Sequence, residues 1–220
     1  MEALERTFES KDWITAIFLL SLLCLVFARA FFLSRFQNFA ILPFNNKYIF
    51  LYNKKGRLTH GFHLAMTLFF FMNLCVYLAL VAGTLLPDEI RVQGSLLPLI
   101  VGVLLLFFGG KLGLQAATAA ILELKPLLAS VVFKKMSYLN YSGLVMFIAN
   151  LLLGYLFEGS KPLVYGSLLL VLLINLVGWL AVLKIHQKAI KSHIFYFILY
   201  LCTLEIAPYL IISNLLKTDI

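Results

Sequence analysis

Charged side chains are scarce in this chain: they make up 13% of its 220 residues, whereas apolar side chains make up 62%. An ordinary soluble domain is about 25% charged and about 45–50% apolar. A soluble fold of this size has too large a surface to hide so many apolar side chains. The shortage of charge therefore excludes an ordinary soluble protein and indicates a chain that lies in lipid.

Cysteine is also scarce, since only Cys24, Cys75 and Cys202 occur, each within an apolar run. An odd number of cysteines with aliphatic neighbours does not indicate a disulfide framework. We interpret all three as small buried apolar side chains.

Several catalytic motifs are missing from the sequence. It has no Walker loop, no GxSxG, no HExxH and no acidic pair of the DxD type in a basic loop. Phosphoryl transfer and metal-dependent hydrolysis therefore lack their usual groups, and we expect a protein that is not an enzyme and needs no cofactor. The net charge of +8 does not indicate nucleic-acid binding, because the bases lie beside apolar runs and no nucleic-acid motif accompanies them.

Long apolar runs dominate what the chain does contain. A helix needs about 20 apolar residues to cross the hydrocarbon core of a membrane. The tail before the first run is net acidic, so it is not the positive n-region of a signal peptide. The sequence predicts a single all-α transmembrane domain over residues 1–220, a polytopic membrane helix bundle of about six transmembrane helices. The expected spans are 13–33, 62–86, 97–122, 141–156, 163–182 and 194–216.

The placement of basic residues predicts the orientation of this bundle. Six spans put thirteen of the eighteen arginines and lysines on one side of the membrane. These are Arg29, Arg35, Lys47, Lys54, Lys55, Arg57, Lys111, Lys125, Lys134, Lys135, Lys184, Lys188 and Lys191. The positive-inside rule places this side in the cytoplasm. Both termini are then expected on the periplasmic side of a bacterial inner membrane.

Two of the basic connections, 34–52 and 130–141, are also rich in aromatic residues such as Phe44, Phe50 and Phe133. Aromatic and basic residues together favour the headgroup layer of a membrane. We interpret both connections as interfacial loops that lie beside anionic lipid headgroups and anchor the neighbouring spans. A specific lipid site is the less favoured alternative.

Glu205 is the strongest candidate for a functional residue, since it lies at the midpoint of the last run, 194–216. A carboxylate there is costly, so it should face the interior of the bundle beside a partner. Pro208 cannot donate a backbone hydrogen bond, which should loosen the helix, and Tyr209 follows one turn after Glu205 on the same face. This cluster suits a proton or cation site, and it equally suits a structural clamp.

Lys111 is the expected partner of Glu205. If the run 97–122 is one continuous helix, both residues lie near mid-depth, and Gly109, Gly110 and Gly113 would let another helix come close. In the alternative, the span ends near Gly110 and Lys111 marks the cytoplasmic boundary.

Three asparagines, Asn73, Asn150 and Asn175, lie in three other runs. Buried amides can hydrogen-bond between membrane helices, each contributing about 0.6–2 kcal/mol. We expect a role in packing, with a polar path through the membrane as the alternative.

All four histidines lie on the basic side, which makes them weak candidates for a metal or haem site. These are His60, His63, His186 and His193. No cysteine or carboxylate completes a recognised metal spacing with them, so we expect no metal.

The last run contains the segment Tyr200-Leu-Cys-Thr-Leu-Glu-Ile-Ala-Pro-Tyr209. This arrangement resembles a domain-of-unknown-function family of multi-pass inner-membrane proteins from Bacteroidota. The match covers this one helix, with Glu205 and Pro208 on the family's Leu-Glu-x-x-Pro pattern. The resemblance implies a bacterial inner membrane and implies nothing about a substrate.

The function expected from these features is that of a membrane subunit or assembly (scaffold) protein, which contacts other membrane proteins or copies of itself through its helices. The alternative is a small transporter or proton-coupled component, with Glu205 as its intramembrane ionisable site. A membrane enzyme acting on lipid is the third and least favoured function. A partner that co-purifies in mild detergent favours the first, and a continuous polar cavity around Glu205 favours the second.

Overall fold

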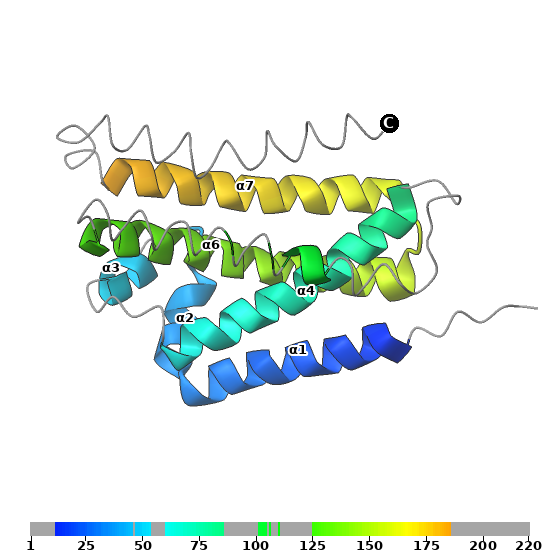
Figure 1. The fold of residues 1–220 in the computed structure, drawn as a ribbon, viewed down its shortest axis with the longest axis horizontal. Helices are drawn as coiled ribbons and strands as arrows, with labels where there is room; N and C mark the ends of the chain where they lie inside the picture. Colours follow the sequence, from blue (N-terminus) through cyan, green and yellow to red (C-terminus); the bar gives the residue numbers. More distant parts are fainter. Residues whose placement is uncertain are drawn as a thin grey trace, which may run out of the picture.

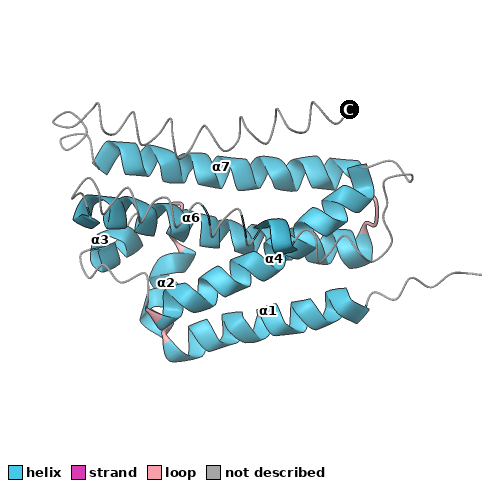
Figure 2. Ribbon diagram, viewed as in Figure 1, coloured by secondary structure: helices cyan, strands magenta, loops and turns pink. Residues whose placement is uncertain are grey.

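The computed structural model of the chain describes residues 12–45, 47–53, 60–85, 101–104, 106, 110 and 125–185. Within these ranges all regular structure is helical, which confirms the predicted all-α class (Figure 2). Four long helices form a bundle, and two short ones lie at one end of it (Figure 1). The long helices are α1 (Asp12–Phe31), α4 (Gly61–Leu85), α6 (Lys125–Leu151) and α7 (Lys161–Ile185), and the short ones are α2 (Leu33–Ala40) and α3 (Lys47–Asn53).

Four segments are long and apolar enough to cross a membrane, namely Asp12–Phe31, Gly61–Leu85, Ser130–Leu156 and Lys161–Ala181. The first and the last bury only 17% of their apolar window inside the molecule. A helix that is apolar all round but packed on one side needs lipid on its other sides. The chain is therefore a membrane protein with several candidate spans.

The predicted runs 13–33, 62–86 and 163–182 coincide with α1, α4 and α7 to within a few residues. The run 141–156 is the second half of a longer helix, because α6 begins at Lys125 and continues into a π-helical turn, η2 (Leu152–Leu156). Of the remaining runs, 97–122 lies mostly outside the described residues and 194–216 lies entirely outside them.

One prediction about the connections is wrong, and another is refined. Residues 130–141, predicted to be an interfacial loop, belong to α6. The aromatic and basic residues of this segment suggested a loop, but Ser137 and Asn140 are fully buried on the same helix face as Phe133, so the segment packs against the rest of the bundle. Residues 34–52 connect two long helices, α1 and α4, as predicted, and this connection consists largely of the short helices α2 and α3.

The long helices alternate in direction except for one neighbouring pair. Helices α1 and α7 end where α4 and α6 begin (Figure 1). Helix α6 packs against both α4 and α7, and α1 packs against α4. Helices α4 and α6 are therefore adjacent and parallel, whereas α1 with α4 and α6 with α7 are antiparallel pairs.

The connection between η2 and α7 is short and depends on one glycine. Gly159 has a φ of +69°, a conformation that costs a glycine far less than a residue with a side chain. The Phe157 N–H donates to the Leu152 carbonyl over 2.7 Å, and Pro162 lies in the first turn of α7, where its missing N–H is tolerated. The chain thereby reverses direction and sets α7 beside α6.

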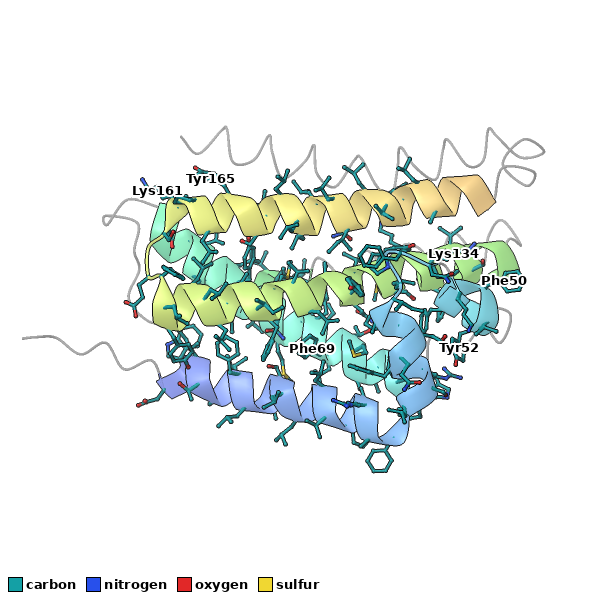
Figure 3. All side chains as sticks on the ribbon, turned by 180° about the vertical axis from the view of Figure 1, so that it is seen from behind. Phe50, Tyr52, Phe69, Lys134, Lys161 and Tyr165 are labelled. Atoms are coloured by element: carbon teal, nitrogen blue, oxygen red, sulfur yellow. The ribbon has the colours of Figure 1, made fainter. Side chains whose placement is uncertain are left out.

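The described charged side chains separate between the two ends of the bundle. We name the end where α4 and α6 begin the basic end. Five described basic side chains belong to the helices that meet there: Arg29, Arg35, Lys47, Lys134 and Lys135. The described acids, Asp12 and Glu158, belong to the opposite end together with Lys161, and Figure 3 shows Lys134 and Lys161 at opposite ends.

Candidate functional site

Two amides join α4 and α6 at the centre of the bundle. Asn73 and Asn150 are 2% and 0% exposed. The Asn150 Nδ2 donates to the Asn73 backbone carbonyl over 2.9 Å, and the Asn73 Nδ2 donates to the Phe69 carbonyl of its own helix over 2.8 Å. Such bonds hold membrane helices in one register, because an unpaired amide in lipid is costly.

A second polar contact lies two turns nearer the basic end. The Asn140 Nδ2 of α6 donates to the Thr67 Oγ1 of α4 over 3.0 Å, and this hydroxyl donates to the His63 carbonyl over 2.8 Å. The His63 ring is 4% exposed and stacks on Phe133 with ring centroids 5.4 Å apart. Polar side chains therefore follow the α4–α6 contact from the basic end inward.

A third polar contact connects α4 to α7 on the other side of the asparagine pair. The Ser167 hydroxyl donates to the Val164 carbonyl over 2.9 Å, and the Tyr77 hydroxyl lies 2.9 Å from the Ser167 Oγ. Tyr77 and Ser167 are both buried. We use the name polar seam for the three contacts together, which comprise His63, Thr67, Asn73, Tyr77, Asn140, Asn150 and Ser167.

Two glycines allow close approach beside the polar seam. A Cβ added to Gly143 of α6 would lie 3.1 Å from the Phe70 Cα of α4. A Cβ added to Gly178 of α7 would lie 2.6 Å from the Tyr138 Cγ of α6. Small residues at such contacts are typical of packed membrane helices, because they let backbones and rings approach closely.

Three buried side-chain atoms in the described part of the chain have no hydrogen-bond partner, and all three belong to the polar seam. They are the His63 Nε2, the Asn140 Oδ1 and the Asn150 Oδ1. The seam therefore offers one imidazole nitrogen and two amide oxygens that could still form hydrogen bonds.

An aromatic cluster closes the basic end. Phe39 of α2 and Tyr48 of α3 are each 1% exposed, and their ring centroids lie 5.5 Å apart. Phe39 meets Phe62 of α4 edge to face at 5.7 Å, and Tyr48 stacks on Phe133 of α6 at 6.0 Å. Edge-to-face and offset-stacked rings at these distances attract one another, so the cluster fixes α2 and α3 onto the long helices.

Arginine and histidine side chains surround this cluster. The Arg35 guanidinium lies 4.5 Å from the centre of the Tyr52 ring, a cation–π contact. Partial burial, and then the positive charge of Arg35, lower the pKa of His60. Burial raises the pKa of the Tyr48 phenol, so this hydroxyl stays neutral.

The structure brings together only some of the residues singled out in the sequence. Asn73 and Asn150 meet, whereas Asn175 donates to the Val171 carbonyl of its own helix over 2.8 Å. The His60 Nδ1 accepts a 3.3 Å bond from the Phe62 N–H. Among the described residues no group of three or more histidine, cysteine or acidic side chains could hold a metal. Other predicted site residues lie outside the described ranges, namely Lys111, His186, His193, Glu205, Pro208 and Tyr209.

Sequence reasoning missed most of the polar seam. Tyr77 could have been found, because it lies one turn after Asn73 on the same helix face. Asn140, which is 0% exposed, could not, because the sequence predicts a loop over the segment that contains it. Ser167 gave no signal, since a serine in an apolar run does not reveal which helix it will face.

Known proteins provide one point of comparison. A family model described as "Domain of unknown function (DUF4271)" matches residues 14–216, a range that contains nearly all of the described helices. No curated protein and no solved structure matches the chain.

Proposed function

The chain belongs to the DUF4271 family, and we propose that it is a multi-pass membrane subunit or assembly protein that acts through helix contacts with other membrane proteins. The main support for the proposal is that the side chains of the polar seam point into the bundle. Asn73, Asn150 and Tyr77 form their hydrogen bonds inside the bundle. Polar side chains that bond to one another inside the bundle hold its helices together as a rigid body. A rigid body with apolar outer faces suits a scaffold.

The outer face of α7 is the proposed contact surface. A row of leucines on this helix is between 49% and 61% exposed: Leu169, Leu172, Leu173, Leu176 and Leu180. Their spacing of three or four residues places most of them on one side of the helix. Such a face can pack against a helix of another protein or of a second copy.

Site-specific photo-crosslinking tests this proposal. A photoreactive residue at Leu173 or Leu176, in the full chain in its native membrane, should give a discrete adduct that contains a second protein chain. The same residue at Leu153, which is 3% exposed inside the bundle, is the matched control and should give none. Lipid adducts alone at both α7 positions, from a chain that sediments as a monomer, would contradict the scaffold function.

A small transporter or proton-coupled component, with Glu205 as its ionisable site, is the alternative function. Its support is the trio of unpartnered atoms on His63, Asn140 and Asn150, because buried polar groups of this kind bind water. Cysteines at Thr67 and Asn140, in a chain without its native cysteines, should then react with a small membrane-impermeant thiol reagent. The control is Leu68→Cys, on the outward face of α4 at 49% exposure. Unreactive seam cysteines would exclude this alternative.

We further propose six spans, with both termini on the periplasmic side of a bacterial inner membrane. The described helices support an odd number of crossings between α4 and α6, because α4 ends at one end of the bundle and α6 begins at the other (Figure 1). Gathering of the described bases at one end supports the orientation. Reporter fusions near Lys55 and Lys188 should be cytoplasmic, and a cytoplasmic C-terminus would contradict the six-span count.

A further inference from the structure

The two short helices α2 and α3 and the turn after α2 form one unit at the basic end, which we name the interfacial pair (residues 33–45 and 47–53). Its inner side is fixed in the bundle, because Phe39, Leu42, Tyr48 and Ile49 are all 0–1% exposed. The Asn45 Oδ1 accepts a 3.0 Å bond from the Lys47 N–H at the start of α3, an Asx-type turn that fixes the direction of the chain. The outer side of the pair is therefore presented in one fixed orientation.

That outer side is strongly apolar. Phe44 is 92% exposed and Phe50 is 72% exposed, and Ile41 and Leu51 beside them are 44% and 45% exposed. Figure 3 shows Phe50 at the same end as Tyr52 and Lys134. Phenylalanines on a fixed surface at the end of a membrane-spanning bundle are typical of a segment that lies in the headgroup boundary.

The charge around the interfacial pair has one sign. Arg35 and Lys47 belong to the pair, Arg29 lies in the last turn of α1, and no acidic residue occurs among the described residues of this end. The Arg35 guanidinium lies over the Tyr52 ring at 4.5 Å, which places its charge beside the pair. At the opposite end, by contrast, Lys161 is accompanied by Asp12 and Glu158.

We propose that the interfacial pair is a binding surface for anionic phospholipid, with Phe44 and Phe50 inserted at the headgroup boundary and Arg35 and Lys47 against lipid phosphates. Apolar side chains that point outward from a fixed surface, Phe44 from the turn and Phe50 from α3, with bases beside them, match the chemistry of such a leaflet. A protein partner would fit the apolar side chains but would need an acidic surface facing the bases. This inference does not depend on the scaffold function, because it concerns lipid alone.

Fluorescence quenching by brominated lipid tests the proposal in the full chain. The chain is placed in nanodiscs of equal parts phosphatidylglycerol and phosphatidylcholine, and only the lipid that carries bromine near its headgroup is changed. Phe44→Trp is the reporter, in a background with Trp13→Phe and Trp179→Phe. We expect stronger quenching when phosphatidylglycerol carries the bromine. Phe50→Trp is a second reporter, because both positions are too exposed for the substitution to disturb folding.

Phe157→Trp is the matched control, since Phe157 is 55% exposed at the opposite end, next to the acidic Glu158. It should be quenched without preference for the anionic lipid. Arg35→Gln combined with Lys47→Gln should remove the preference for anionic lipid at position 44. The reason is that each base near an anionic surface changes the affinity for that surface about fivefold. Equal quenching of Phe44→Trp by the two lipids overturns the proposal. So does the absence of quenching, which would place Phe44 in water or under a protein, and so does a preference that survives removal of both bases.

Discussion

The side-chain amide of Asn150 on α6 donates a 2.9 Å hydrogen bond to the backbone carbonyl of Asn73, the central residue of α4. The two helices are parallel, so this bond fixes how far one is shifted along the other. It lies in the buried middle of the bundle, where water does not compete for the amide. The register of α4 against α6 therefore depends on this side chain, together with the bond from Asn140 to Thr67.

Replacing Asn150 should show this dependence. Asn150→Leu keeps the number and branching of the side-chain heavy atoms and removes the interhelical bond, so the free energy of unfolding should fall by about 0.6–2 kcal/mol. Asn175→Leu is the matched control, because Asn175 bonds only within its own helix, and it should change the stability less. Unfolding in detergent followed by circular dichroism measures both. Equal effects of the two variants would mean that the Asn150 bond does not join the helices.

Gly178 tests the contact between α6 and α7. An added Cβ would lie within 2.8 Å of three atoms at the root of the Tyr138 side chain, which cannot swing away. We expect Gly178→Ala to lower the stability by about 1–3 kcal/mol, as overpacking does. Gly166→Ala on the same helix meets nothing within 4 Å and should be neutral or slightly stabilising. Thermal unfolding of the two variants in detergent compares them, and a stable Gly178→Ala protein would contradict the packing of α6 on α7.

His60 should titrate below its usual value of 6.5, because partial burial and the charge of Arg35 both disfavour its protonated form. The unfolded chain then binds more protons than the folded one just below pH 6.5, so this residue makes the protein less stable as the pH falls through that region. Arg35→Gln should raise the pKa of His60, and Lys161→Gln at the opposite end should leave it unchanged. Nuclear magnetic resonance of the imidazole measures it. An unchanged pKa in Arg35→Gln would show that the two side chains do not interact.

Glu205 distinguishes the two proposed functions. It lies at the midpoint of the run 194–216. Under the scaffold function we expect Glu205→Gln to fold and to support the cellular role of the protein, because an amide replaces a protonated acid with similar donors and acceptors. A folded protein that has lost its role would instead support a site that must change its charge. Complementation in cells, with expression level as the control, measures the outcome.

The parts of the fold that the sequence predicted are those governed by long apolar runs. Helices α1, α4 and α7 follow from hydropathy alone, because only lipid or a core can accommodate such segments. The start of α6 did not follow, since aromatic and basic residues such as Phe133 and Lys134 indicated an interfacial loop. Burial of this segment depends on partners on other helices, such as Thr67 for Asn140, and a single run of sequence does not contain that information.

The sequence likewise predicted only part of the candidate site. Asparagines inside apolar runs are conspicuous, and two of the three meet in the bundle. Which of them meet depends on the rotation of each helix about its axis, and therefore on contacts such as that between Gly143 and Phe70. The interfacial pair was expected to be aromatic and basic, but its division into a buried and an exposed side follows only from the packing of α2 and α3.

The parallel arrangement of α4 and α6 has a consequence for how the chain enters the membrane. Synthesis proceeds from the N-terminus, so the hairpin of α1 and α4 can assemble before the hairpin of α6 and α7 exists. The hydrogen bonds from Asn140 to Thr67 and from Asn150 to Asn73 then unite two hairpins that have already inserted. We expect two polypeptides, divided in the connection between α4 and α6, to reassemble in one membrane and to co-purify. Asn140→Leu combined with Asn150→Leu should weaken that reassembly far more than it weakens either hairpin.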